Sequence, residues 1–286
     1  MKIGISGASG NLGRAVLKRL ADLSGDHNVI GISRSPDGVR QAHEARFGDY
    51  DAPDRLREAY AGLDSLLIIP TIDIAFGARA RQLVRAIDAA VAAGVGHIVL
   101  ISDVGTRDEP EPCVGAASWA GEQHLVRFAR CWTILRANYF MESYAEEVLL
   151  WQAVGHIAEL GQGRTGFVSR DDVADAAAGI LVGEGHGGAI YNATGPEALS
   201  PAQSAALIAS VTGRPMKVFE TSVEGLHQHL RAASFPEPYF GIVTDTKQKT
   251  AAGGFDIVTG DLERLSGHPP RALADVLKRY LAAPGS

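Results

Sequence analysis

Short apolar segments alternate with longer amphipathic segments along the first half of the chain. The apolar segments are bounded by glycine, proline or polar residues, which is typical of buried parallel strands. They cover residues 2–6, 28–33, 65–70, 96–102 and 132–136, and residues 45–50 are predicted to be a further strand with its exit turn. Between them, apolar residues recur at helical spacing, as in residues 12–23, 54–61 and 78–93. This alternation predicts an α/β fold, a Rossmann-type doubly wound parallel sheet joined by right-handed crossovers.

The second half of the chain predicts a smaller C-terminal α/β lobe. Ser200 and Pro201 are typical of a helix start, and this helix should end at Gly213. A strand over residues 216–221 and helices over 223–233 and 272–281 follow. The polar segment 244–254, which contains Lys247 and Lys249, is expected to be a mobile lid. We expect a dinucleotide-binding domain over residues 1–155 and a substrate lobe over 156–286, interlocked around a cleft.

A glycine-rich turn, GASGNLG, follows the first predicted strand directly. Gly7 fits a tight turn out of the strand, Gly10 leaves bare backbone against a pyrophosphate, and Gly13 allows close approach of helix and sheet. The next helix would present its free N–H groups to the phosphates. Glycine triplets are common in a chain with 33 glycines, but strand, turn, helix and second strand stand here in the required order. The turn therefore predicts dinucleotide binding.

The second predicted strand ends in Ser33-Arg34-Ser35, where an NAD-binding protein would carry an acidic residue for the ribose. Arg34 can instead form a charge-assisted contact with a 2′-phosphate. NADP(H) is therefore favoured as the cofactor, and NAD(H) remains possible. The alternative is that Arg34 is a solvated loop cation.

The ligand of a doubly wound sheet lies at the carboxyl ends of its strands, so the residues after each strand are the candidate site. The expected cofactor contacts are Gly7, Ser9, Gly10, Asn11, Leu12, Gly13, Ser33, Arg34, Asp49, Tyr50, Thr71 and Ser102. Asp103 and Asn138 are candidate catalytic hydrogen-bonding groups, and both could equally be turn formers.

Aromatic residues gather after two of the predicted strands and in one loop of the small lobe. They are Trp119, then Tyr139, Phe140 and Tyr144, and finally Tyr239 and Phe240 in a proline-framed loop. Together they predict a slot for a flat aromatic substrate. The alternative is that they are ordinary core aromatics.

Composition excludes several other classes of function. The net charge of −6 gives no basic stripe for nucleic acid, and no apolar stretch is long enough for a membrane helix. Cys113 and Cys131 have no metal-ligand spacing, and the histidines are scattered, so no metal site is predicted. With a first strand at residue 2 we expect no leader segment and a cytoplasmic protein, either monomer or homodimer.

Several segments in the same order resemble the NmrA-like atypical short-chain dehydrogenase/reductases. They are residues 47–53 (FGDYDAP), 61–64 (AGLD), 132–142 (WTILRANYFME), 169–178 (SRDDVADAAA), 191–195 (YNATG), 261–265 (DLERL) and 277–281 (LKRYL). The resemblance spans essentially the whole chain and is strongest to the branch of NADPH-dependent quinone oxidoreductases and triphenylmethane reductases. It implies an NADP(H)-dependent oxidoreductase.

The chain departs from this family at the proton donor. Many short-chain dehydrogenases use a Tyr-x-x-x-Lys pair, but none of the seven tyrosines here has a lysine four residues later. The related quinone reductases commonly carry His or Lys four residues before a helix glutamate. Alignment on Glu122 places Ser118 there, and Ser118 is the third catalytic candidate.

Ketone reduction builds an alkoxide that needs a positioned acid, so the missing acid makes it a poor fit. A quinone-like or polycyclic aromatic acceptor delocalises the arriving charge and needs mainly proximity to the nicotinamide. Two alternatives stay open: an NAD(P)-binding redox sensor without turnover, and quinone reduction followed by O₂-dependent hydroxylation of an aromatic natural product.

Overall fold

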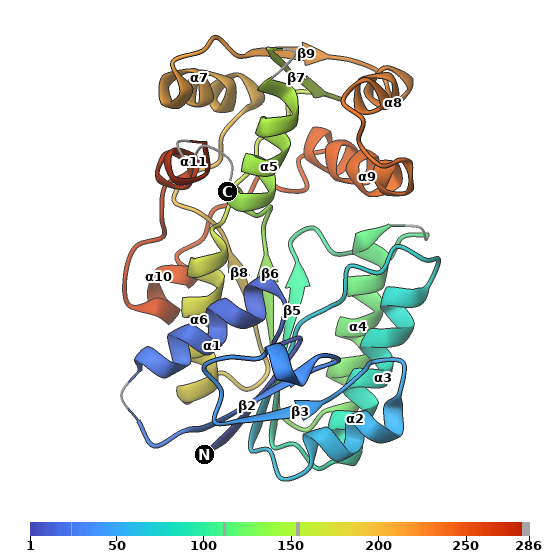
Figure 1. Ribbon diagram of the computed structural model, residues 1–286, viewed down its shortest axis with the longest axis vertical. Helices are drawn as coiled ribbons and strands as arrows, with labels where there is room; N and C mark the ends of the chain where they lie inside the picture. The colour runs from blue at the N-terminus through green and yellow to red at the C-terminus, as the bar shows by residue number, and fades with distance from the viewer. Residues whose placement is uncertain (24, 111–112, 153–154, 282–286) are drawn as a thin grey trace.

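Seven parallel strands form the central sheet, in the order β3-β2-β1-β4-β5-β6-β8 (Figure 1). They are β1 (Lys2–Ser6), β2 (Asn28–Ser33), β3 (Glu44–Phe47), β4 (Ser65–Ile68), β5 (His97–Asp103), β6 (Trp132–Ala137) and β8 (Ala189–Ala193). The computed structural model describes all residues except 24, 111–112, 153–154 and 282–286. The predicted Rossmann-type α/β fold is confirmed. The order in which strands are added to the sheet reverses between β1 and β4, which is where such sheets bind ligands.

Helices cover both faces of the sheet because successive strand residues point to opposite sides. Leu67 of β4 packs in the core beneath α1 (Asn11–Asp22) and α6 (Arg170–Val182). Leu66 and Ile68 pack on the other face, beneath α2 (Pro53–Tyr60), α3 (Ala78–Ala92) and α4 (Val114–Phe128). Within the described residues, no helix is long and apolar enough to cross a bilayer.

A third apolar core forms the small lobe above the carboxyl ends of the strands (Figure 1). It is built from α5 (Met141–Gln152), α7 (Pro201–Thr212), α8 (Val223–Ala232), α9 (Phe240–Ala251) and α11 (Leu273–Leu281). A separate parallel pair, β7 (His156–Glu159) with β9 (Lys217–Glu220), completes it. The helix predicted from Ser200 and Pro201 is confirmed, with Ser200 as part of a capping box and Gly213 at its end.

The chain passes between the two parts more than once, which the expected boundary after residue 155 does not describe. Helix α5 precedes that boundary and packs in the small lobe. Helix α6 and strand β8 follow it, yet β8 pairs with β6 and α6 lies against α1 and α10 (Asp261–Ser266). The buried alanines of α6 permit this close packing, and a Cβ on its Gly179 would lie 2.2 Å from the Leu265 carbonyl oxygen.

The expected lid at residues 244–254 is wrong. Most of this segment is the second half of α9, and Lys247 and Lys249 are only 3% and 4% exposed. Lys247 Nζ lies 2.5 Å from Glu147 Oε1 and 2.7 Å from Glu159 Oε1. The polar residues that suggested a solvated loop therefore include a lysine that forms buried ion pairs from α9 to helix α5 and strand β7 of the small lobe.

Candidate active site

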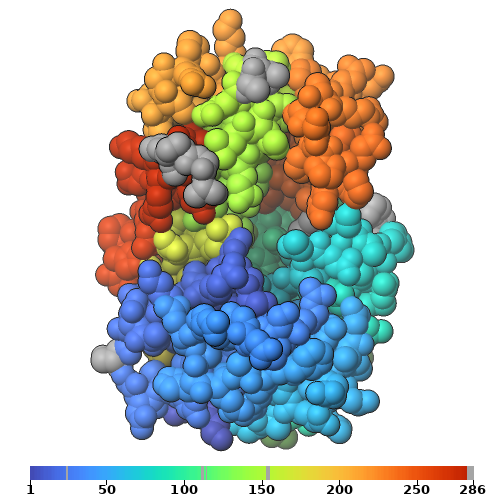
Figure 2. Space-filling model, viewed as in Figure 1, coloured from blue at the N-terminus to red at the C-terminus, as the bar shows by residue number. Residues whose placement is uncertain are grey.

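One cavity of about 910 Å³ lies at the carboxyl ends of the strands, beneath the small lobe. Figure 2 shows the surface hollowed between the sheet domain and the small lobe. Its lining comes from the ends of the six strands β1 to β6, from the first turns of α1 and α3, and from α5 and the start of α6. All twelve residues expected to contact the cofactor line this cavity: Gly7, Ser9, Gly10, Asn11, Leu12, Gly13, Ser33, Arg34, Asp49, Tyr50, Thr71 and Ser102.

The glycine turn forms a cradle that side chains would fill. Gly7 has a φ of 92°, in the region that favours glycine, and its N–H donates to the Ile32 carbonyl oxygen at 3.0 Å. A Cβ on Gly13 would lie 2.3 Å from the Gly7 carbonyl oxygen. No side chain caps α1 at Gly10, so its first N–H groups remain available to an anion. These features fit the pyrophosphate of a dinucleotide.

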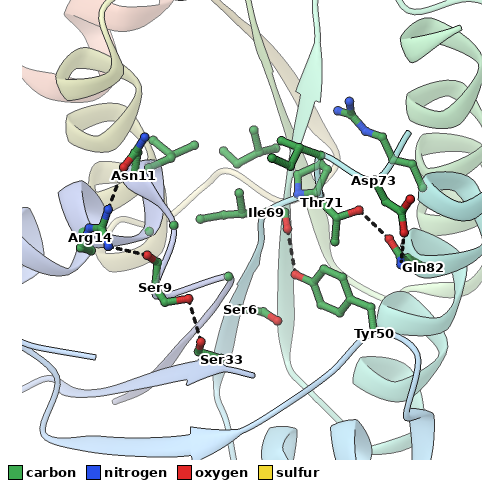
Figure 3. A pocket seen from close by; sticks show the side chains of 18 of the residues that line it. Ser6, Ser9, Asn11, Arg14, Ser33, Tyr50, Ile69, Thr71, Asp73 and Gln82 are labelled. Atoms are coloured by element: carbon green, nitrogen blue, oxygen red, sulfur yellow. Dashed lines mark hydrogen bonds between the residues drawn. The ribbon is translucent and has the colours of Figure 1, made fainter. Parts of the chain in front are cut away.

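The end of β2 joins this cradle through two serines (Figure 3). The Ser33 hydroxyl donates to the Ser9 hydroxyl at 2.8 Å. The neighbouring Arg34 is exposed, lines the cavity and forms no ion pair with any described residue. Its guanidinium is therefore available to a phosphate at this end of the cavity.

A hydrogen-bonded wall forms the opposite side of the cradle (Figure 3). The Tyr50 hydroxyl donates to the Ile69 carbonyl oxygen at 2.9 Å, and burial raises the pKa of Tyr50 to about 12. Thr71 donates to Gln82 of α3, whose amide in turn donates to Asp73. Tyr50 and Thr71 are thus fixed neutral groups in the wall.

At the end of β5, Ser102 donates to the carboxylate of Glu122 at 2.5 Å. Arg136 donates to the same carboxylate from Nε at 2.9 Å, and this hydrogen bond raises the pKa of Arg136. Glu122 is only 1% exposed, so the pairing compensates a buried charge. Ser102 therefore faces the cavity from a rigid support.

The three catalytic candidates occupy different places. Asp103 lines the cavity, and its carboxylate accepts from Ser118 at 2.5 Å and from Arg79 at 3.1 Å. Ser118 is 1% exposed and is absent from the lining. Asn138 is also buried outside the lining, where it donates to the Phe255 carbonyl oxygen. The geometry supports Asn138 as a local structural residue and Ser118 as a support for Asp103.

The six candidate aromatics do not form one slot. Phe140 lines the cavity, with the Arg170 guanidinium 5.8 Å from its ring centroid. The other five lie outside the lining: Tyr139, Tyr144 and Phe240 belong to the small-lobe core or pack against it, Tyr239 is 40% exposed, and Trp119 is half-buried on α4. Burial raises the pKa values of Tyr139 and Tyr144, so both phenols stay neutral.

Sequence reasoning missed several residues that line the cavity. They are chiefly Ile72, Asp73, Arg79, Gln82, Glu146 and Arg170. Arg79 and Gln82 are three residues apart in the first turns of α3, so both reach the same side of that helix. Polar residues at this spacing, at the start of the helix that follows β4, were the available signal.

The comparisons with known proteins agree with this geometry. A family model described as NAD(P)H-binding matches residues 7–183, which include the glycine turn and most of the sheet. The chain belongs to this NAD(P)H-binding family. The resemblance predicted from the sequence is thereby confirmed.

Two relatives and one solved structure match this chain almost end to end. NAD(P)H azoreductase from Xenophilus azovorans is 26% identical over 99% of both chains. Quinone oxidoreductase 2 from Escherichia coli (strain K12) is 28% identical over 96% of both. The crystal structure of Citrobacter sp. triphenylmethane reductase complexed with NADP(H) covers 98% of this chain and 100% of its own, with a TM-score of 0.88 and 26% identity.

Proposed function

We propose that this protein is an NADP(H)-dependent oxidoreductase that transfers hydride to a quinone-like or polycyclic aromatic acceptor. The observation that carries the proposal is one continuous cavity that joins the glycine cradle to the ends of β5 and β6. The named reductases support it, because quinones, azo compounds and triphenylmethane dyes are all extended conjugated acceptors.

The chain's own residues bind and orient the reactants. The cradle at Gly7 and Gly13 and the N-terminus of α1 hold the pyrophosphate, which directs the other half of the dinucleotide toward β4 and β5. The cofactor supplies the hydride when bound. Ser102 and Asp103 form the floor against which the acceptor ring is placed. A conjugated acceptor then takes its proton from water.

Arg34 should determine the preference for the phosphorylated cofactor. Arg34→Ala removes a charge-assisted contact worth about 1.5–3 kcal/mol, so the Kd for NADPH should rise roughly 10- to 100-fold. The Kd for NADH should stay within about twofold. Isothermal titration of both nucleotides measures this. Arg40→Ala is the matched control, because Arg40 is an exposed cation of the same segment outside the cavity lining. An unchanged ratio of the two Kd values would show that Arg34 is a solvated cation.

The acceptor should also contact the loop between β4 and α3. Ile72 lines the cavity and is 84% exposed, which leaves an apolar side chain free to pack on a flat ring. Ile72→Ser should raise the KM for an apolar quinone roughly tenfold, equivalent to about 1.4 kcal/mol of lost contact, with little change in kcat. Steady-state kinetics with a naphthoquinone tests this. Ile74→Ser in the same loop, outside the lining, should leave KM unchanged.

One assay tests the function as a whole. The protein is mixed with NADPH and a panel of quinones, azo compounds, triarylmethane dyes and polycyclic pigments, while nicotinamide absorbance and oxygen are followed. Consumption of NADPH that depends on the acceptor is the expected result. Oxygen uptake with a hydroxylated product would favour the hydroxylation alternative. No consumption with any acceptor would overturn the proposal and favour a redox sensor.

A further inference from the structure

Arg79 brings a positive charge to the end of β5, where the acceptor is proposed to lie. It belongs to the first turn of α3, lines the cavity, and has a side chain 19% exposed. The cations among the described lining residues are Arg14, Arg34, Arg79 and Arg170. Arg14 is bound to Ser9 and Asn11 of the glycine turn. Arg79 is the one that contacts a residue of β5.

The Arg79 guanidinium is held from one side only. Its Nη2 donates to Asp103 Oδ2 at 3.1 Å, and the same oxygen accepts from Ser118 Oγ. Its Nε is buried and has no hydrogen-bond partner among the described residues. A buried unpaired donor is costly, so this group favours a ligand that supplies an acceptor oxygen. Asp103 and Ser118 together fix the orientation of the guanidinium.

We propose that Arg79 is a catalytic residue that stabilises the negative charge arriving on the acceptor, with Asp103 and Ser118 as its positioning residues. This inference rests on the proposed function. When hydride leaves the nicotinamide C4, its C–H bond breaks and both electrons pass to the acceptor, while NADPH becomes NADP⁺. A quinone thereby becomes a hydroquinone monoanion, whose oxygen then takes a proton from water.

The chemistry of arginine suits this role better than that of an acid. Its guanidinium stays protonated, so it lowers the energy of the anion without giving up a proton. A fixed cation in a cavity from which water is partly excluded stabilises an anion more strongly than a cation in bulk water does. The chain has no Tyr-x-x-x-Lys pair, and Arg79 of α3 is the group that stabilises the developing charge in its place.

A first experiment measures hydride transfer in single turnovers with 1,4-naphthoquinone. Arg79→Met should slow transfer roughly 10²- to 10³-fold, with the Kd for NADPH within about twofold of wild type. Arg79→Lys and Asp103→Asn should be intermediate. Arg81→Met is the matched control, because Arg81 is exposed on the same helix and lies outside the lining. Unchanged transfer in Arg79→Met would overturn the inference, as would a loss explained by weaker NADPH binding.

A second experiment needs no turnover and separates this inference from the proposed function. The protein saturated with NADP⁺ is titrated with 2-hydroxy-1,4-naphthoquinone, an anion at neutral pH, and with neutral 1,4-naphthoquinone. Arg79→Met should weaken binding of the anion at least tenfold relative to the neutral ring. If the anion binds at least tenfold more weakly to Arg79→Met but the protein oxidises no NADPH, the proposed oxidoreductase function is overturned and the anion site is retained. Equal effects on both ligands would overturn the role of Arg79.

Discussion

Gly13→Ala should lower both the stability of the fold and the affinity for NADPH. The added methyl group would lie 2.3 Å from the Gly7 carbonyl oxygen and 2.8 Å from Ala8 Cα. Both are backbone atoms of the turn, so the helix or the turn must move, at a cost of about 1–3 kcal/mol. The shift displaces the N–H groups that face the pyrophosphate, so the Kd for NADPH should rise roughly 100-fold. Chemical unfolding and isothermal titration measure the two effects.

Gly10→Ala provides the contrast within the same turn. Gly10 has a φ of −74°, which any residue can adopt, and the nearest atom to its Cβ would be the Gly7 carbonyl oxygen at 3.3 Å. We expect a change in unfolding free energy within about 1 kcal/mol, with weaker NADPH binding because the methyl group faces the phosphates. A Gly13→Ala protein that is as stable as wild type would contradict the close approach of α1 to the backbone of the glycine turn.

The sheet could be predicted because its signals are local. Strands β1, β2, β4, β5 and β6 are short, largely apolar runs between polar turns, and the glycine turn fixes the first crossover. Strand β3, at the edge of the sheet, is the exception, because Glu44 and Arg46 make half of it charged. Strand β8 is a weak signal because it is short, contains Asn192, and lies at the edge of the sheet, where only its last residue is buried. Helix α6 is buried through small alanines and has little amphipathic pattern. Their place in the large domain depends on tertiary packing that the sequence does not display.

The cofactor half of the site was predictable for the same reason, whereas the acceptor half was not. Backbone at strand ends forms the cradle, so strand boundaries were sufficient to select Gly7 to Gly13, Ser33 and Thr71. The orientation of the aromatic side chains after β6 depends on their tertiary contacts. The Tyr139 hydroxyl, for example, donates to Glu147 at 3.0 Å within the small lobe. Arg79 reaches the cavity from a neighbouring helix, and no local pattern pairs it with Asp103.

The buried ion pairs of Lys247 could not be predicted from the sequence either, and they are the basis of the second large prediction. Lys247→Met should lower the free energy of unfolding by about 3–5 kcal/mol near pH 8, because it leaves Glu147 and Glu159 buried without their cation. Tyr139 and Trp151 still donate hydrogen bonds to Glu147 in the variant, but neither donor carries a charge that could replace the ammonium group. Urea unfolding at pH 8 measures the loss.

Lys249→Met is the matched control on the same helix. Lys249 is equally buried, but its Nζ lies 3.7 Å from both Glu109 and Asp245, beyond hydrogen-bond distance. Its removal should therefore cost less than that of Lys247. Equal losses in the two variants would show that burial of the lysine stem, rather than the close ion pairs, stabilises the small lobe.

The loss in Lys247→Met should depend on pH in a definite direction. Burial raises the pKa of Glu159, and Lys247 opposes that rise, so the variant should have a still higher Glu159 pKa. The folded variant then binds more protons than the unfolded chain between the ordinary carboxyl pKa and the raised value. Its stability should therefore increase as the pH falls from 8 toward 5, and part of the loss should be recovered. Urea unfolding of wild type and variant across this range measures it, and a loss that is constant with pH would contradict the ionised carboxylates as its cause.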